Sequence, residues 1–310
     1  MSHAVETQGL GRSFGPRVAL SDVTLTVGEG EMFALLGPNG SGKTTLFRIL
    51  STLLAPTAGT ARVGGHDVSA APMDVRHHLG VVFQSPALDP QLTVAENLRC
   101  AGNLYGLSGG DLEERLRAAA EALEVTDRLD DRVQTLSGGL QRRVEVAKSL
   151  LSRPRVLLLD EPSTGLDPAA RAGLRAVLGK LLRESGVTIV MTTHLLDEAE
   201  VCDRVAILHR GRLIACETPA ALRARLGQDV AVLSGPDPEA LAVRVRAAFG
   251  WPAAVRDGKV RVEVPRGEDT AAQLFAAFGP AADAVTVGRP TLEDVFLELT
   301  GEPLRGEDER

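Results

Sequence analysis

One glycine-rich stretch decides the fold: Gly37-Pro38-Asn39-Gly40-Ser41-Gly42-Lys43-Thr44. It fits the pattern G-x-x-x-x-G-K-[ST] at each fixed position, between an apolar run at 32–36 and a helix-like segment at 43–53. Glycines let the backbone turn tightly and aim its N–H groups at phosphate oxygens, and a helix N-terminus adds the positive end of its dipole. The stretch therefore predicts a P-loop, with Lys43 on the β- and γ-phosphates of a nucleotide and the Thr44 hydroxyl on Mg²⁺.

A second motif ends an apolar run with two acids. The run 156–159 is followed directly by Asp160 and Glu161. An aspartate at the end of a buried strand is costly unless it serves a metal or a donor. We therefore expect Asp160 to hold Mg²⁺, directly or through an intermediate group. Glu161 is expected to polarise the water that attacks the γ-phosphate.

Short apolar runs alternate with helix-like segments over residues 1–226. The runs are nearly continuous, which is typical of parallel strands covered on both faces. They lie at 32–36, 81–83, 156–159, 187–191 and 205–208. The main helix-like segments lie at 43–53, 111–123, 139–151 and 168–182. This alternation predicts an α/β layered domain with a mostly parallel sheet.

The pattern changes after about residue 225. Strand-like runs at 230–233, 260–264 and 284–287 alternate with helix-like segments at 240–249, 270–278 and 292–299. We expect a small α+β domain at 227–301 and a polar, flexible tail at 302–310. No second copy of the P-loop motif is present in the sequence.

Charge and hydropathy exclude several classes of partner. The net charge of −7 argues against a broad basic face for DNA or RNA, so no nucleic acid is expected. The apolar runs are far shorter than the ~18 residues that a membrane-spanning helix needs. The first residues carry no basic and apolar segments of a secretory signal, and the three cysteines form no metal-type cluster. We expect a cytosolic chain that reaches a membrane only through a partner.

Further motifs resemble those of the ATP-binding cassette (ABC) family of ATPases, over roughly residues 1–226. Leu136-Ser137-Gly138-Gly139 stands directly before a helix, as the signature loop of that family does. Residues 162–167, which follow Glu161, resemble its D-loop. The resemblance implies a P-loop NTPase fold with a mostly parallel core sheet, an antiparallel β subdomain and a helical subdomain at about 86–152.

The resemblance also assigns roles to single residues. Gln84 stands at the Q-loop position, His194 at the switch-histidine position, and Phe14 in the place of the aromatic that stacks on adenine. The implied catalytic residues are Lys43, Gln84, Glu161 and His194. The implied Mg²⁺ ligands are Thr44, Gln84 and Asp160. The implied ATP-binding residues are Phe14, Gly37, Pro38, Asn39, Gly40, Ser41, Gly42, Lys43, Thr44, Thr45, Ser137, Gly138 and Gly139.

One position departs from the family pattern. The family signature usually continues Ser-Gly-Gly-Gln, whereas Leu140 follows Gly139 here and Gln141 comes one residue later. Ser137 and Gly139 remain, so we expect phosphate binding to survive. A direct contact from a glutamine at position 140 is not expected.

In the family, two cassettes pair head to tail and hold ATP between the P-loop of one and the signature loop of the other. The resemblance implies that this chain pairs with a second copy of itself and docks on a separate membrane permease, at the cytoplasmic face of the membrane. The segment after Gln84 would receive the permease. Its apolar residues either dock or belong to the core, and both readings stay open: Leu88, Leu92, Val94 and Leu98.

The ending 292–301, Leu-Glu-Asp-Val-Phe-Leu-Glu-Leu-Thr-Gly, resembles that of a daunorubicin-resistance-like subgroup, whose members power two-component export of drugs, lipids or polysaccharides. Its apolar spacing also suits any amphipathic helix that packs on its own domain. The alternative function is a soluble cassette ATPase that acts on the ribosome or DNA. Cassette ATPases that act on the ribosome carry two cassettes in one chain, whereas this sequence has one P-loop, and the acidic charge disfavours DNA. A cassette that binds ATP without hydrolysing it would have lost Glu161 or His194.

Overall fold

The structure, a computed structural model, describes residues 3–226, 229–256, 258–265, 269–279, 281–302 and 304. These residues form two compact units that divide between Pro219 and Ala220. The division falls inside helix α8 (Pro219–Ala224), slightly before the expected boundary at residue 226. Of the expected tail at 302–310, only Glu302 and Leu304 lie within the described residues.

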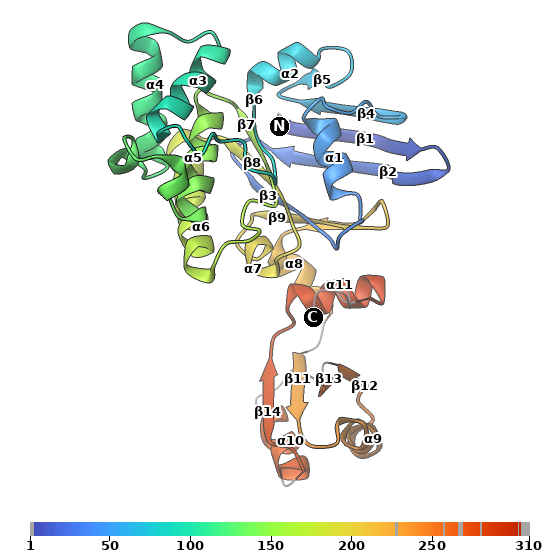
Figure 1. The fold of residues 1–310 in the computed structure, drawn as a ribbon. Helices are drawn as coiled ribbons and strands as arrows, with labels where there is room; N and C mark the ends of the chain where they lie inside the picture. Colours follow the sequence, from blue (N-terminus) through green and yellow to red (C-terminus); the bar gives the residue numbers. More distant parts are fainter. Residues whose placement is uncertain are drawn as a thin grey trace. The chain divides into compact units, whose positions relative to one another are not determined.

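A six-stranded sheet forms the centre of the first unit (Figure 1). Its strand order is β10-β9-β3-β8-β7-β6, and all neighbours are parallel except β9 and β10. The strands are β3 (Met32–Leu36), β6 (Leu79–Val82), β7 (Val156–Asp160), β8 (Thr188–Thr193), β9 (Arg204–His209) and β10 (Arg212–Glu217). Every residue of β3, β7 and β8 is buried, as expected for strands covered on both faces. The predicted α/β fold with a mostly parallel sheet is confirmed.

Some element limits differ from the prediction. Strand β6 begins at Leu79 because its residues pair in register with β7 from Val156 onward. Strand β8 continues through Thr192 and Thr193, which pair with the end of β3 although they are polar. Helix α1 (Lys43–Leu50) ends three residues early, and Thr52 behind it takes a left-handed φ of 62°.

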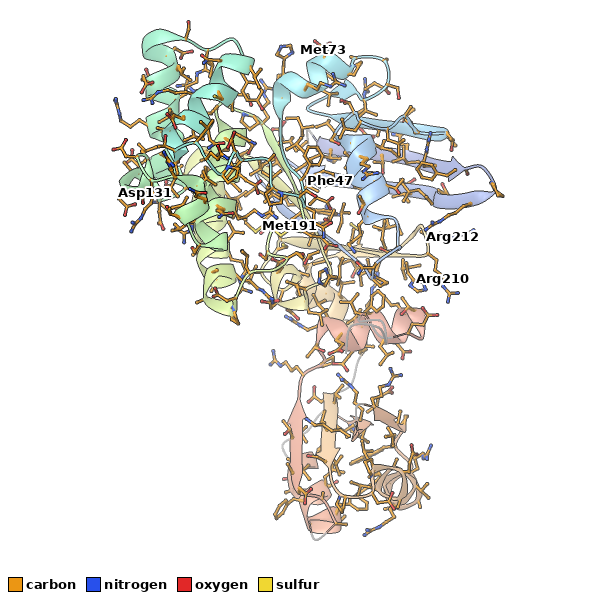
Figure 2. The ribbon with its side chains drawn as sticks, viewed as in Figure 1. Phe47, Met73, Asp131, Met191, Arg210 and Arg212 are labelled. Atoms are coloured by element: carbon orange, nitrogen blue, oxygen red, sulfur yellow. The ribbon has the colours of Figure 1, made fainter. Side chains whose placement is uncertain are left out.

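A second sheet is antiparallel, with the strand order β2-β1-β4-β5. Its strands are β1 (His3–Phe14), β2 (Arg17–Gly28), β4 (Ala58–Val63) and β5 (His66–Asp67). Helix α1 contacts β2 and β4, and Phe47 of α1, labelled in Figure 2, shares one apolar core with Val5, Val23 and Phe33. The antiparallel subdomain that the resemblance implied is therefore present, and it holds the P-loop helix between two sheets.

Helices occupy the other side of the central sheet in Figure 1. Helices α3 (Val94–Leu104), α4 (Gly109–Ala122) and α5 (Gly138–Leu150) pack on one another, and α6 (Pro168–Ser185) packs on α5. Helix α5 also contacts strand β6. The remaining elements of this unit are short: α2 (Pro72–His78), η1 (Thr126–Arg128), η2 (Val133–Thr135) and α7 (Leu196–Ala199).

The second unit is a small α+β layer with the antiparallel strand order β12-β13-β11-β14. Its strands are β11 (Asp229–Ser234), β12 (Ala253–Arg256), β13 (Lys259–Val264) and β14 (Ala284–Gly288). Its helices are α9 (Pro238–Phe249), α10 (Thr270–Phe278) and α11 (Leu292–Thr300). Leu233, Val262 and Leu274 lie in its apolar core. Across the described residues of both units, no helix has the length and hydropathy of a membrane span.

Candidate nucleotide-binding and hydrolysis site

The P-loop joins the end of β3 to α1. Gly42 lies directly before α1 with a φ of 109°, and a Cβ there would lie 2.8 Å from the carbonyl oxygen of Ala19. Only glycine fits this position without strain. Lys43 begins the helix and is 4% exposed; its Nζ donates to the carbonyl oxygens of Gly37 (2.7 Å) and Pro38 (3.2 Å). The loop thus closes on its own lysine.

A cavity of about 390 Å³ opens beside this loop. Six of the thirteen predicted ATP-binding residues line it, and so do three of the four predicted catalytic residues, Lys43 being in both sets: Asn39, Gly40, Gly42, Lys43, Thr44, Thr45, Gln84 and Glu161. Gly37, Pro38 and Ser41 belong to the same loop but lie outside the lining. The structure therefore brings the P-loop and Glu161, the residue that follows β7, to one cavity.

Five lining residues escaped the sequence analysis: Arg17, Val18, Ala19, Arg210 and Gly211. Gly211, in the turn between β9 and β10, donates its N–H to the carbonyl of Ser41 (2.9 Å) and accepts from the N–H of Ser21 (2.8 Å). A Cβ at Gly211 would lie 2.6 Å from the carbonyl oxygen of Ala19. This turn therefore joins the P-loop to β2. No sequence signal pointed to it, because an Arg-Gly turn is common in any hairpin.

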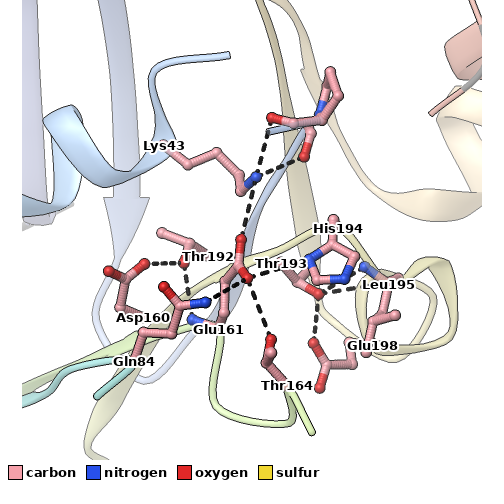
Figure 3. Close-up of polar contacts among 12 residues, drawn as sticks. Lys43, Gln84, Asp160, Glu161, Thr164, Thr192, Thr193, His194, Leu195 and Glu198 are labelled. Carbon is pink, nitrogen blue, oxygen red and sulfur yellow. Dashed lines mark hydrogen bonds and ion pairs between the residues drawn. The ribbon is translucent and has the colours of Figure 1, made fainter. Parts of the chain in front are cut away.

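Glu161 is the centre of the polar contacts (Figure 3). Its Oε1 lies 3.4 Å from Nζ of Lys43, and its Oε2 lies 3.3 Å from Nδ1 of His194. The same Oε2 accepts from Nε2 of Gln84 (3.5 Å) and from Oγ1 of Thr164 (3.2 Å). The four predicted catalytic residues, which are far apart in the sequence, thus meet at one carboxylate.

The backbone of Glu161 takes a rare conformation. Its φ is 45°, in the left-handed region that non-glycine residues seldom adopt, and such strain gathers at functional sites. The Glu161 N–H donates to Oγ1 of Thr192 (3.0 Å), which holds it in this position. The strained backbone conformation of Glu161 is therefore stabilised by its hydrogen bond to Thr192 of the neighbouring strand β8.

Electrostatics keep Glu161 ionised. A hydrogen bond with His194 and the charge of Lys43 lower its pKa from 4.5 to about 2, against the raising effect of burial. Asp160 behaves differently: burial raises its pKa, and a hydrogen bond from Thr192 opposes the rise. Two adjacent carboxylates thus have opposite shifts, a pattern that accompanies divided roles in a site.

Hydrogen bonds of Thr193 hold the loop that carries His194. Thr193 donates its hydroxyl to Oε2 of Glu198 and accepts the N–H of Leu195 (2.9 Å). Both threonines at the end of β8 are almost fully buried. The predicted apolar run at 187–191 stops before these two threonines, and no role was predicted for either of them.

The signature residues lie at the start of α5. Ser137 precedes the helix and its Oγ accepts the N–H of Leu140 (3.4 Å). Ser137 and Gly138 are exposed, and none of the residues 137–139 lines the cavity or contacts Glu161. Nε2 of Gln141 donates to the carbonyls of Val133 (3.1 Å) and Leu136 (3.0 Å). Gln141 thus supports the loop from inside and does not replace a glutamine at position 140.

Three other predicted site residues also lie outside the cavity lining. Phe14 is 47% exposed at the end of β1, with the guanidinium of Arg12 4.6 Å from its ring centroid; Val18 lines the cavity instead. Asp160 is buried behind the lining, and His194 reaches the site only through Glu161.

The residues fit both groups that the sequence implied. Gly40 and Gly42 line the cavity with positive φ, so bare backbone faces the space in which phosphates would be held. The hydroxyl of Thr44 and the amide of Gln84 line the same space, and hydroxyl, amide and carboxylate oxygens are the ligands that Mg²⁺ prefers. A cation close to Asp160 would offset the cost of its buried charge.

Comparison with known proteins agrees with a site for ATP. The model of the ABC transporter family matches residues 20–164. The chain is 36% identical to the daunorubicin/doxorubicin resistance ATP-binding protein DrrA of Streptomyces peucetius, over 97% of this chain and 94% of that protein. It is 38% identical to the Nod factor export ATP-binding protein I of Paraburkholderia xenovorans (strain LB400), over 97% and 98%. It is 32% identical to the linearmycin resistance ATP-binding protein LnrL of Bacillus subtilis (strain 168), over 97% and 99%.

Solved structures share the fold. CbiO1 from Clostridium perfringens, part of the ABC transporter complex cbiONQ, is 26% identical with a TM-score of 0.68, over 81% of this chain and 97% of that chain. The ATP-binding cassette MJ0796, in a dimeric post-hydrolysis state bound to ADP and Pi, is 29% identical with a TM-score of 0.61, over 69% and 98%. The chain therefore belongs to the family of ABC transporter ATP-binding subunits, ATPases of the type found in drug and Nod factor exporters.

Proposed function

We propose that this chain hydrolyses Mg²⁺-ATP to power the export of a drug, a lipid or a polysaccharide through a separate membrane permease. The observation that carries the proposal is the meeting of Lys43, Gln84 and His194 at Glu161, beside the P-loop cavity. The export of these cargo classes is supported by relatives named for daunorubicin, linearmycin and Nod factor, which match over nearly the whole chain.

Each residue has a chemical task in this proposal. The P-loop backbone and Lys43 bind the β- and γ-phosphates, and Phe14 stacks on the adenine. Thr44, Gln84 and Asp160 would hold Mg²⁺, which would neutralise charge on the phosphate oxygens. Glu161 orients the attacking water, and His194 holds the carboxylate in place.

The low pKa of Glu161 bears on its task. A carboxylate with a pKa of about 2 is a weak proton acceptor, so it orients water better than it deprotonates it. Lys43 contributes to that low pKa from 3.4 Å.

The signature loop supports a dimer. Ser137 and Gly138 are exposed and stand apart from the cavity of their own chain, so an incoming second copy can use them. In our proposal two copies pair head to tail, and Ser137 and Gly139 of one copy bind the γ-phosphate held by the other. Hydrolysis removes that contact, and the pair opens because ATP binds one state more tightly than the other.

The pair would lie at the cytoplasmic face of the membrane, attached through the permease. The alternative of a cassette ATPase that acts on ribosomes or DNA is not favoured, because relatives that match 97% of the chain are transporter subunits.

Co-purification tests the proposal. The tagged chain would be recovered from detergent-solubilised native membranes, and ATP hydrolysis would be assayed on the product, with Lys43→Ala as the inactive control. We expect a polytopic membrane protein in the eluate and hydrolysis that Lys43→Ala abolishes. Recovery of ribosomes or nucleic acid without a membrane protein would contradict the transporter assignment and leave the ATPase assignment intact.

A further inference from the structure

Side chains of one helix hold the loop that follows Gln84. Residues 83–90 contain no helix or strand, and most of them are exposed. Arg142 of α5 donates to the carbonyl of Phe83 (2.8 Å) and to the carbonyl of Gln84 (3.1 Å). The N–H of Ala87 donates to Oε1 of Glu145 (2.6 Å), and Nζ of Lys148 donates to the carbonyl of Ala87 (2.6 Å). Helix α5 therefore holds the first part of this loop, residues 83–87, whereas Asn97 of α3 bonds with Asp89 further along.

The three side chains are arranged for this contact. Arg142, Glu145 and Lys148 follow one another at intervals of three residues, which places successive members on the same side of a helix. Arg142 and Glu145 also pair with each other at 2.7 Å, and their side chains are only 7% and 6% exposed. Burying two charges is costly, and a well-packed apolar pair often serves stability as well or better. The buried Arg142–Glu145 pair is therefore better explained by its role in fixing the position of the loop than by stability alone.

The contact between α5 and the loop links two parts of the ATP site. Nε2 of Gln84 lies 3.5 Å from Oε2 of Glu161, so the position of the loop decides where Gln84 meets the catalytic carboxylate. Helix α5 begins directly after Ser137, at the signature loop. One rigid helix thus connects the Gln84 loop with the residues proposed to bind the ATP of a second copy.

We propose that Arg142, Glu145 and Lys148 are positioning residues that tie the Gln84 loop to the signature helix, so that the two parts of the ATP site move together. They act through Gln84 and Ser137 and need no contact with ATP. The inference rests on the proposed function, because it requires a hydrolytic site completed by a second copy.

The test compares variants of the full-length chain. Arg142→Gln removes both bonds to the loop carbonyls, and Lys148→Met removes one bond without leaving a buried charge. We expect kcat for ATP to fall about 10- to 100-fold in Arg142→Gln and about 2- to 5-fold in Lys148→Met, with KM within about 3-fold, because small misplacements of positioned groups act on the transition state. Amide hydrogen exchange at 83–90 should accelerate in both variants.

The matched control is the next residue of the same helix. Arg143 pairs with Glu124 at 3.0 Å, and no hydrogen bond from Arg143 to residues 83–90 occurs in the part of the chain that the structure describes. Arg143→Gln removes an ion pair from α5 and leaves the loop contacts in place. We expect kcat within about 2-fold of the wild-type value and unchanged exchange at 83–90.

The outcomes separate the inference from the proposed function. If Arg142→Gln and Lys148→Met match Arg143→Gln in kcat and in exchange, the inference is wrong. A rise in KM at constant kcat would also overturn it, since that pattern marks lost ground-state binding. If Arg142→Gln does not fold, Lys148→Met decides alone. If Lys43→Ala hydrolyses ATP like the wild type, the proposed function fails instead.

Discussion

The two units of the chain bury charge very differently, although both layer helices on sheets. Among its described residues, the first unit buries six charged side chains: Lys43, Arg142, Glu145, Asp160, Glu161 and Glu198. Among the described residues of the second unit, Asp294 is the charged side chain that is buried to the same degree. Because burying a charge is costly, the contrast locates the chemistry in the first unit.

The burial of Asp294 in the second unit has a structural explanation. Asp294 accepts the N–H of Thr291 (2.7 Å) in a capping box at the start of α11, and it pairs with Arg261. These contacts stabilise a helix end. In the first unit, Lys43 and Asp160 adjoin Glu161 at a cavity, and Arg142 and Glu145 hold a loop. Buried charge thus supports a fold in one unit and a reaction in the other.

Replacing a lysine by alanine should give the largest difference in ATP hydrolysis between the two units. Lys43→Ala should lower ATP hydrolysis at least about 100-fold, because it removes the positive charge next to the transferring phosphate. Lys259→Ala, in the exposed part of β13, is the matched change in the second unit and should leave hydrolysis within about 2-fold. A phosphate-release assay on both purified variants checks this. Equal activities would remove the functional distinction between the units.

Identical core truncations should have different consequences in the two units. Leu158 in β7 and Leu233 in β11 are both fully buried. Each change to alanine should lower the free energy of unfolding of its own unit by about 2–5 kcal/mol. Calorimetry and a hydrolysis assay should show that Leu158→Ala also loses activity, since β7 positions Asp160 and Glu161, whereas Leu233→Ala retains it. If Leu233→Ala lost ATP hydrolysis and Leu158→Ala retained it, the assignment of catalysis to the first unit would be wrong.

Stability should depend on pH through Glu161. Its folded-state pKa of about 2 lies below its ordinary value of 4.5, so the ionised form stabilises the fold. The contribution is about 3 kcal/mol near pH 7, and it is lost as the pH falls from about 5 toward 2. In urea unfolding without nucleotide, the stability difference between the wild type and Glu161→Gln should shift by about 2 kcal/mol against the wild type between pH 7 and pH 3. A difference that stays constant with pH would contradict the low pKa.

The smallest expected effect concerns the departure from the family signature. Leu140→Gln restores the usual residue, yet Ser137 already accepts the backbone N–H of residue 140, and Gln141 already supports the loop. We expect kcat to change by no more than about 2-fold. A gain of about 10-fold or more would show that Leu140 limits the native enzyme.

The central sheet and the Glu161 cluster could largely be predicted from the sequence. Continuous apolar runs such as that of β7 give a strong signal because both faces of the strand are buried. The P-loop glycines and the acids after β7 stand at fixed spacings. Gln84 and His194 have no such signal of their own, and only the resemblance assigned them to the site where the structure places them.

The remaining parts depend on contacts that no short sequence window contains. Strands β1 and β2 pair over their lengths through register shifts, which interrupt the alternation that would mark them. Gly211 bonds with the P-loop residue Ser41, although the two residues are far apart in the sequence. The contacts of Arg142 go to backbone carbonyls 58 and 59 residues away, and backbone acceptors carry no sequence signature.

The most direct test of the central claim is ATP turnover by Glu161→Gln, measured together with its oligomeric state by light scattering. We predict that hydrolysis falls at least about 100-fold while ATP binding persists, and that ATP converts the variant into a stable pair of chains. Hydrolysis at the wild-type rate would contradict the role of Glu161, and with it the site that we describe.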